Sequence, residues 1–191
     1  MAILKSGKNV FITGPAGSGK TYLLNRYIDW LAQAGIIPAV TASTGIAATH
    51  LNGITIHSWT GMGVHDDLSE SDVKELTKRG YLRQRFLRTQ VLVIDEISML
   101  AHYQLDLADR LFRAFKRTDA PFGGVQVVLC GDFFQLPPIS RKPTEESREP
   151  KRRVKTQASM FGQELLNDGQ AKFAYCSRAW NELDLKICYL D

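Results

Sequence analysis

The chain has 191 residues, a formal net charge of +4 and 44% hydrophobic residues, which is the composition of one globular domain. These values exclude a disordered, collagen-like or fibrous chain. No apolar run approaches the roughly 18 residues that a membrane-spanning helix needs, and residues 1–5 are too short for a secretory signal. We therefore expect no membrane partner, and because no targeting segment is visible we expect a cytoplasmic location in a bacterium or virus. In a eukaryote we expect a nuclear or mitochondrial location, with the targeting segment outside these residues.

The positive charge is unevenly placed along the chain. Residues 141–155 hold seven Lys or Arg and three Asp or Glu, so this polar stretch accounts for the whole excess. A solvated loop explains such a stretch, and the charge by itself does not indicate nucleic acid. The three cysteines, Cys130, Cys176 and Cys188, lack the spacing of a zinc site or a disulfide framework, which predicts reduced and mostly buried thiols.

Short apolar runs rich in β-branched residues alternate with helical segments. They predict strands at residues 9–13, 36–40, 91–94, 125–129 and 185–190. Because these runs are almost continuously apolar, we expect a sheet that is buried on both faces. The alternation of strands with helices predicts an α/β fold in which helices sandwich a parallel sheet.

Three further segments complete the organisation. After Met99, apolar residues at helical spacing predict an amphipathic helix whose buried face is formed by Leu105, Ala108, Leu111, Phe112 and Phe115. Residues 62–90 change from acidic to basic, and residues 141–157 are polar with two prolines. Both fit the sheet pattern poorly, so we interpret them as insertions or long loops within one domain.

The first predicted strand runs directly into a glycine-rich segment. This segment, Gly14-Pro15-Ala16-Gly17-Ser18-Gly19-Lys20-Thr21, matches G-x-x-x-x-G-K-[ST] and precedes a predicted helix that begins near Lys20. Glycines let backbone N–H groups surround a phosphate, and the helix N-terminus favours negative charge. Lys20 is expected to reach the β- and γ-phosphates and Thr21 to bind Mg²⁺.

A pair of carboxylates ends the third apolar strand. Asp95 and Glu96 follow residues 91–94, which places them at the carboxyl edge of the sheet beside the glycine-rich segment. Asp95 is the candidate for holding Mg²⁺, and Glu96 is the candidate general base for an attacking water. A strand end that merely caps a helix is the alternative.

A polar segment also follows the fourth apolar strand. Within Gly131-Asp132-Phe133-Phe134-Gln135-Leu136-Pro137-Pro138, the Gln135 amide has the chemistry to contact a γ-phosphate or its attacking water. A turn fixed by the two prolines and capped by Asp132 is an equally good interpretation.

Five segments in this order resemble motifs I, Ia, Ib, II and III of the Pif family of superfamily 1 DNA helicases, with the RecD-like helicases as near relatives: residues 14–21, 41–48, 56–61, 95–99 and 131–138. The resemblance extends to the segment Ser177-Arg178-Ala179-Trp180 before the last strand. It implies that residues 1–191 form one P-loop NTPase domain, the first RecA-like motor domain (1A). Residues 62–90 then resemble the family's small wedge subdomain (1B).

The resemblance also implies an activity and its partners. Family members hydrolyse ATP with Mg²⁺, move 5′ to 3′ along single-stranded DNA and unwind duplex or structured DNA, with roles in repair, recombination and telomere maintenance. Motifs Ia and Ib line the DNA track, which in this chain implies contacts from Thr41, Ser43, Thr44, Gly45 and His57. These side chains suit phosphate oxygens. A core or turn position is the alternative for His57 taken alone.

The wedge-like segment mixes cations with aromatics. Its Arg83, Arg85 and Arg88 lie close in sequence to Tyr81 and Phe86, which is typical of a platform for single-stranded DNA. A solvated helix surface is the alternative for these side chains.

The chain lacks motifs IV, V and VI of the family's second motor domain. That domain supplies an arginine finger, so we expect the missing domain to be a partner, either from the rest of the polypeptide or from a separate one. We expect no DNA unwinding by this chain alone. Two other classes stay open: a nucleotide-binding interaction module with little turnover, and a P-loop kinase, for which we find no Arg-bearing lid.

Overall fold

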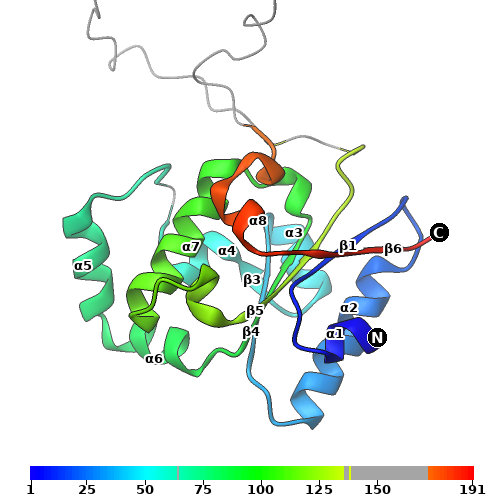
Figure 1. Ribbon diagram of the computed structural model, residues 1–191, viewed down its shortest axis with the longest axis horizontal. Helices are drawn as coiled ribbons and strands as arrows, with labels where there is room; N and C mark the ends of the chain where they lie inside the picture. Colours follow the sequence, from blue (N-terminus) through cyan, green and yellow to red (C-terminus); the bar gives the residue numbers. More distant parts are fainter. Residues whose placement is uncertain (64, 136–137, 139–171) are drawn as a thin grey trace, which may run out of the picture.

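The computed structural model describes residues 1–63, 65–135, 138 and 172–191. Within these residues six strands form one all-parallel sheet in the order β3-β2-β4-β5-β1-β6 (Figure 1). The strands are β1 Val10–Thr13, β2 Pro38–Ala42, β3 Ile54–Thr55, β4 Val91–Asp95, β5 Gln126–Cys130 and β6 Lys186–Tyr189. The parallel α/β architecture predicted from the alternation of strands and helices is confirmed.

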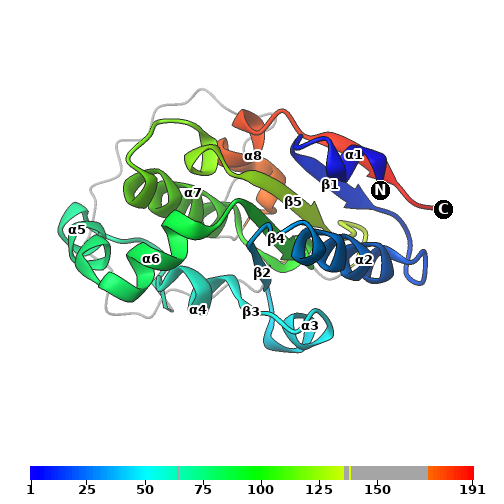
Figure 2. The ribbon, with the colours of Figure 1, turned by 90° about the horizontal axis from the view of Figure 1, so that it is seen from below.

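Helices cover both faces of the sheet. They are α1 Ala2–Lys5, α2 Lys20–Gln33, α3 Gly45–His50, α4 Ile56–Thr60, α5 Glu70–Lys78, α6 Gly80–Arg88, α7 His102–Lys116 and α8 Arg178–Glu182, with short 3-10 turns at Ile97–Met99, Pro121–Gly124 and Ala174–Cys176. Figure 2 shows α7 and α2 on opposite sides of the strands. One hydrophobic core holds the residues from α4 to α8, and the other holds those from α1 and α2.

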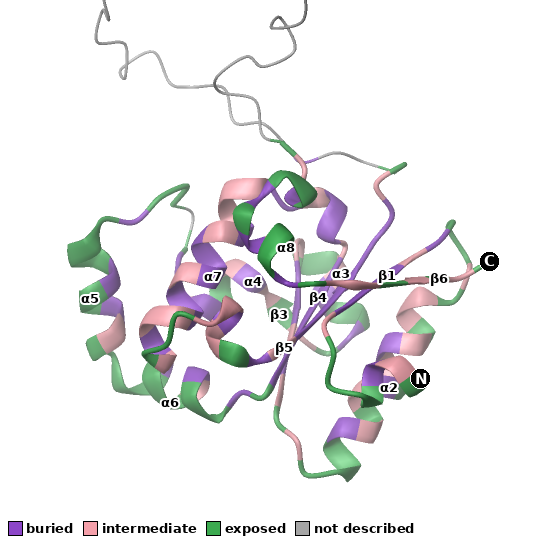
Figure 3. Cartoon of the chain, viewed as in Figure 1, coloured by how far each residue is buried: buried purple, intermediate pink, exposed green. Residues whose placement is uncertain are grey.

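Alternate strand residues belong to different cores. In β4, Leu92 and Ile94 pack on the α7 side, whereas Val91 and Val93 pack on the α2 side. All five residues of β4 and four of the five residues of β5 are buried, whereas the edge strand β6 alternates between intermediate and exposed residues (Figure 3). A strand that buries both faces cannot alternate apolar with polar residues, which explains the continuous apolar runs.

One predicted strand is displaced by two residues, and one observed strand was not predicted. The predicted strand at residues 36–40 begins instead at Pro38, because the Ile36 amide donates to Leu31 O (2.9 Å) beyond Gly35, whose φ is +70°. Ile36 therefore belongs to the end of α2. The short edge strand β3, which pairs with Thr41 and Ala42, was missed because two residues carry no periodicity. Residues 141–157, predicted to be a polar loop, lie outside the described residues.

Residues 62–90 contain two helices that pack on α7. Phe86 is fully buried and stacks on Phe115 with ring centroids 4.0 Å apart. Arg85 donates from Nη1 to the carbonyl oxygen of Trp59 at 2.7 Å. The interpretation of Phe86 and Arg85 as parts of a DNA-stacking platform is therefore wrong, because both are used by the fold, whereas Tyr81 stays exposed.

Two expectations about the whole chain can be compared with the structure. All three cysteines are free, but only Cys130 is buried, since Cys176 is exposed and Cys188 is half-buried. Among the residues that the structure describes, no helix combines the length and apolar character needed to cross a bilayer.

Candidate nucleotide and nucleic-acid site

The glycine-rich loop joins β1 to α2 and has a backbone that only glycines adopt easily. Gly17 and Gly19 have φ of +81° and +86°. A Cβ on Gly14 would lie 2.1 Å from the carbonyl oxygen of Leu190, just after β6. α2 begins at Lys20, and its N-cap Gly19 provides no side-chain cap. The first N–H groups of α2 are thus left for another acceptor, which suits a phosphate.

Two polar groups of this loop have no hydrogen-bond partner outside the loop among the described residues. The Lys20 ammonium donates to the loop's own carbonyl oxygens, Gly14 O and Pro15 O, both at 2.8 Å. The buried hydroxyl of Ser18 has no hydrogen-bond partner among the described residues. Buried polar groups are normally paired, so an unpaired hydroxyl and a cation that bonds loop carbonyls suit an anionic ligand.

Four of the residues predicted for catalysis or Mg²⁺ binding line one cavity of about 380 Å³ at the carboxyl edge of the sheet, called here the nucleotide-side cavity. Lys20 is not among its lining residues. Its lining combines residues from the loop, β4, α3 and the segment after β5: Thr21, Thr44, Ile46, Ala47, His50, Asp95, Glu96, Ser98, Met99 and Gln135. The structure therefore brings Thr21, Asp95, Glu96 and Gln135 together, although they are up to 114 residues apart.

Burial dominates the electrostatics of the two carboxylates. It raises the pKa of Asp95, against the hydrogen bonds from Cys130 and the Glu96 amide and the charge of Lys20. The Glu96 pKa is also raised, first by burial and then by the neighbouring negative charge of Asp95. A carboxyl with a raised pKa is a better proton acceptor than an ordinary one once it is ionised.

Glu96 has a left-handed backbone, with φ 52° and ψ 45°. Such a conformation in a residue other than glycine typically costs about 1–3 kcal/mol and persists where neighbouring contacts enforce it. Asp95 Oδ1 accepts from the Glu96 amide at 2.9 Å. The turn thus fixes the two carboxylates in different positions immediately after β4.

The segment after β5 contains the predicted Asp132 cap, whereas Pro137 lies outside the described residues. Asp132 caps the turn by accepting from the Phe134 amide (3.0 Å) and from Gln135 Nε2 (3.0 Å). These bonds lower the pKa of Asp132. Gln135 nevertheless lines the nucleotide-side cavity, so the turn presents its amide there.

A second cavity, of about 590 Å³, adjoins the first and is called here the track cavity. It is lined by Ser43, Thr44, Thr55, His57, Ser58, Gly63, Met99, Ala101, Gln104 and Pro138. Thr44 and Met99 line both cavities, so these two residues separate them.

The predicted DNA contacts are only partly brought together. Ser43, Thr44 and His57 line the track cavity, and Gly45 is exposed at the start of α3. Thr41 is fully buried, and its hydroxyl donates to the carbonyl oxygen of Val93 at 2.7 Å within the sheet. Thr41 therefore supports β2 and does not reach this surface.

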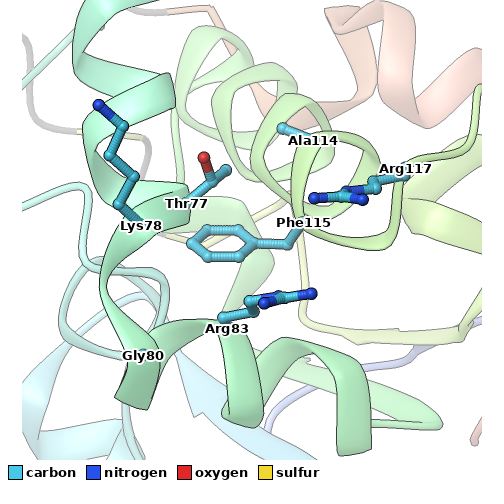
Figure 4. Close-up of a pocket in the computed structure, with 7 residues that line it drawn as sticks. All are labelled: Thr77, Lys78, Gly80, Arg83, Ala114, Phe115 and Arg117. Carbon is cyan, nitrogen blue, oxygen red and sulfur yellow. The ribbon is translucent and has the colours of Figure 1, made fainter.

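A third cavity lies at the other end of α7. It has a volume of about 360 Å³ and is lined by Thr77, Lys78, Gly80, Arg83, Ala114, Phe115 and Arg117 (Figure 4). Ala101 and Ala114 mark the two ends of α7, about 20 Å apart at 1.5 Å per residue. The lining holds neither a carboxylate nor any residue of the phosphate loop, so this cavity does not belong to the nucleotide site.

Two residues of the nucleotide-side cavity were missed from the sequence. His50 ends α3 and lines the cavity with Asp95. The buried hydroxyl of Ser98 has no hydrogen-bond partner in the described part of the chain. No sequence signal marks His50, whereas Ser98 lies two residues after Glu96 and could have been suspected from that position.

The residues present fit ATP with Mg²⁺. Thr21 offers a hydroxyl and Asp95 a carboxylate, and both are hard oxygen ligands of the kind that Mg²⁺ accepts together with phosphate oxygens. The uncapped start of α2 and the Lys20 ammonium suit the phosphates themselves. Fold and site together define a P-loop nucleoside triphosphatase domain with a RecA-like sheet.

Comparison with known proteins agrees with this class. The family model described as PIF1-like helicase matches residues 1–161. The chain is 49% identical over 188 residues to the ATP-dependent DNA helicase Pif1 of Psychrobacter sp. (strain PRwf-1), covering 98% of the chain and 25% of that protein. It is 43% identical over 140 residues to the human ATP-dependent DNA helicase PIF1, covering 73% of the chain and 21% of that protein.

Two solved structures are similar along almost the whole chain. The Pif1 helicase of Candida albicans has a TM-score of 0.77 at 34% identity, covering 99% of this chain and 38% of that one. The Pif1 helicase of Bacteroides in complex with ADP-AlF3 and ssDNA has a TM-score of 0.73 at 33% identity, with 99% and 39% covered. The chain belongs to the PIF1-like helicase family. It spans about a quarter of the length of the curated relatives it matches.

Proposed function

We propose that this chain is an ATP-hydrolysing motor domain whose turnover is coupled to single-stranded DNA. The observation that carries the proposal is the pair of adjoining cavities that share Thr44 and Met99. One cavity is lined by Thr21, Asp95, Glu96 and Gln135, which suit Mg²⁺ and the γ-phosphate, and the phosphate loop runs directly into Thr21. The other cavity is lined by hydroxyls and an imidazole suited to phosphate oxygens. The Bacteroides relative crystallised with ADP-AlF3 and ssDNA supports both ligands.

The proposed reaction is the hydrolysis of ATP to ADP and phosphate. Glu96 accepts a proton from water as the water oxygen bonds to the γ-phosphorus and the bond from that phosphorus to the β–γ bridging oxygen breaks. Lys20 and Gln135 donate hydrogen bonds to the negative charge that develops on the γ-phosphoryl oxygens. Mg²⁺, held by Thr21 and Asp95, would supply charge neutralisation at the phosphates.

The whole protein is proposed to be a 5′ to 3′ DNA helicase. A second motor domain, joined to this one or supplied separately, would close over the nucleotide and contribute the arginine finger that family resemblance implies. Duplex or structured DNA would then be unwound ahead of the single strand, with residues 62–90 as the wedge-like element. This chain alone should not unwind DNA. A strand-displacement assay tests this directly, and unwinding by the isolated chain would contradict it.

The test is steady-state ATP hydrolysis with and without oligo-dT, at low and at moderate salt, for the wild-type chain and Glu96→Gln. We expect turnover that rises with oligo-dT, falls as salt screens phosphate contacts, and is lost in the variant. Bound nucleotide with no turnover in either condition would contradict the proposal and favour an interaction module. Phosphoryl transfer to a small acceptor without a DNA effect would favour a kinase.

A further inference from the structure

Ser43 directly contacts the turn that carries Glu96. Its amide donates to Asp95 O at 3.1 Å, and its hydroxyl donates to Glu96 O at 2.7 Å. The cause is strand register, because Ala42 pairs with Asp95 and the next residue along β2 therefore lies beside Glu96. The side chain that follows one strand thus holds the backbone that follows its neighbour.

The Glu96 turn depends on such contacts. Its φ of 52° is unfavourable for a residue with a side chain, so the surrounding hydrogen bonds determine whether the conformation persists. Glu96 O also accepts from the Met99 amide at 3.1 Å. Loss of the Ser43 hydroxyl would therefore leave a satisfied carbonyl and a folded turn, but with one restraint fewer.

The residue that carries this hydroxyl also lines the cavity proposed for DNA. Ser43 lines the track cavity together with His57. A serine hydroxyl has one proton to donate, and the oxygens of a DNA phosphate diester only accept. A phosphate bound to this hydroxyl must therefore take the proton that otherwise goes to Glu96 O.

We infer that Ser43 is a positioning residue that restrains Glu96 when the track cavity holds no DNA and releases it when a DNA phosphate accepts its proton. The inference rests on the proposed function, in which Glu96 is the general base. DNA would then stimulate ATP turnover because the Ser43 hydroxyl exchanges its hydrogen bond to Glu96 O for one to a DNA phosphate. The released turn needs no unfolding, because the Met99 amide still holds it.

The experiment measures kcat for ATP with saturating oligo-dT and without DNA, using the full chain. The variants are Ser43→Ala, Ser43→Thr, which keeps a hydroxyl, and the control Thr49→Ala. Thr49→Ala removes an exposed hydroxyl of α3 from a residue that lines neither cavity. Binding of a fluorescent ATP analogue shows that each variant is folded. Saturating DNA removes any effect of Ser43 on DNA affinity from the comparison.

We expect Ser43→Ala to raise the DNA-free kcat and to lower the stimulation ratio by at least about fivefold, the lower end of typical coupling between sites. Ser43→Thr and Thr49→Ala should keep the wild-type ratio. An unchanged ratio in Ser43→Ala would overturn the inference. So would a fall in the DNA-stimulated rate alone, which would make Ser43 only a DNA contact, or a loss of both rates with nucleotide still bound. Absence of turnover in the wild-type chain would instead overturn the proposed function, and this inference with it.

Discussion

The ammonium group of Lys20 donates to the carbonyl oxygen of Gly14 at 2.8 Å. The cation that is expected to bind phosphate is therefore bonded to a carbonyl of its own loop. A nucleotide must replace this bond and the matching one to Pro15 O with bonds to phosphate oxygens. The exchange favours the nucleotide, because hydrogen bonds between charged groups are stronger than those to a neutral carbonyl.

Lys20→Ala should weaken ATP binding by about tenfold or more, since a hydrogen bond to a charged group contributes about 1.5–3 kcal/mol. Titration with a fluorescent ATP analogue measures the change. Lys116→Ala is the matched control, because its ammonium also donates to a carbonyl oxygen, that of Thr89, but outside both cavities. Equal affinity in Lys20→Ala and wild type would contradict the assigned role.

Gly14→Ala should abolish nucleotide binding and lower the free energy of unfolding by about 3 kcal/mol, because the new Cβ would overlap the Leu190 carbonyl oxygen. Denaturant unfolding and nucleotide titration measure the two effects. Gly7→Ala is the control: Gly7 also has a positive φ, of +76°, but nothing lies within 4 Å of its added Cβ. Gly7→Ala should lower the free energy of unfolding only by the cost of a side chain in a left-handed backbone, about 1–2 kcal/mol. Similar losses of unfolding free energy in both variants would refute the steric argument.

Gln135→Ala should lower kcat by about 10- to 100-fold and leave ATP binding nearly unchanged, because the amide is proposed to act on the γ-phosphoryl group in the transition state. Steady-state kinetics with a separate binding titration distinguish the two effects. Gln33→Ala, at the exposed end of α2, is the control. A variant that binds ATP more weakly at unchanged kcat would assign Gln135 to ground-state binding instead.

Asp109→Ala should lower the free energy of unfolding by about 3 kcal/mol, because it removes a fully buried carboxylate that accepts from the Phe122 amide (2.6 Å) and Arg113 Nε (2.8 Å). Asp109→Asn should cost less, since its amide oxygen can still accept from Phe122. Burial raises the pKa of Asp109, so the carboxylate is held at a desolvation cost that the asparagine avoids.

Urea unfolding followed by ellipticity measures both Asp109 variants. Asp184→Ala is the control, because its carboxylate is exposed and its ion pair with Lys186 is screened by solvent, so its loss should change stability little. Wild-type stability in Asp109→Ala would contradict this account of the Asp109 carboxylate.

High pH should destabilise the chain through Tyr27. Burial raises its pKa from 10.0 to about 12, and its hydroxyl donates to Gln126 Oε1 at 2.8 Å. Between these two values the folded state keeps a proton that the unfolded state loses, so the free energy of unfolding falls as pH rises, by about 2–3 kcal/mol in total. Unfolding measured from pH 9 to about 12 tests this, and Tyr27→Phe should lack that part of the decrease. A parallel pH dependence in variant and wild type would contradict it.

The local pattern of apolar residues was sufficient to predict the main strands and α7. The apolar runs before Gly14 and Asp95 predicted β1 and β4 within one residue, because a strand buried on both faces has a continuous apolar sequence. The spacing of the glycines before Lys20 predicted the phosphate loop. The helical spacing of apolar residues predicted the buried face of α7. Phe86 and Arg85 were misinterpreted for the opposite reason, since their sequence environment is the same whether a helix faces solvent or packs on α7.

By itself the sequence determined the chemistry that is available: a loop for phosphate, two carboxylates after a strand and a glutamine after the next one. Only the tertiary structure decided what these groups contact. Pairing of β2 with β4 places Ser43 on the Glu96 carbonyl, and α3 places Thr44 between the two cavities. Strand order and register are long-range choices made by packing of the whole sheet, so no local pattern contains them.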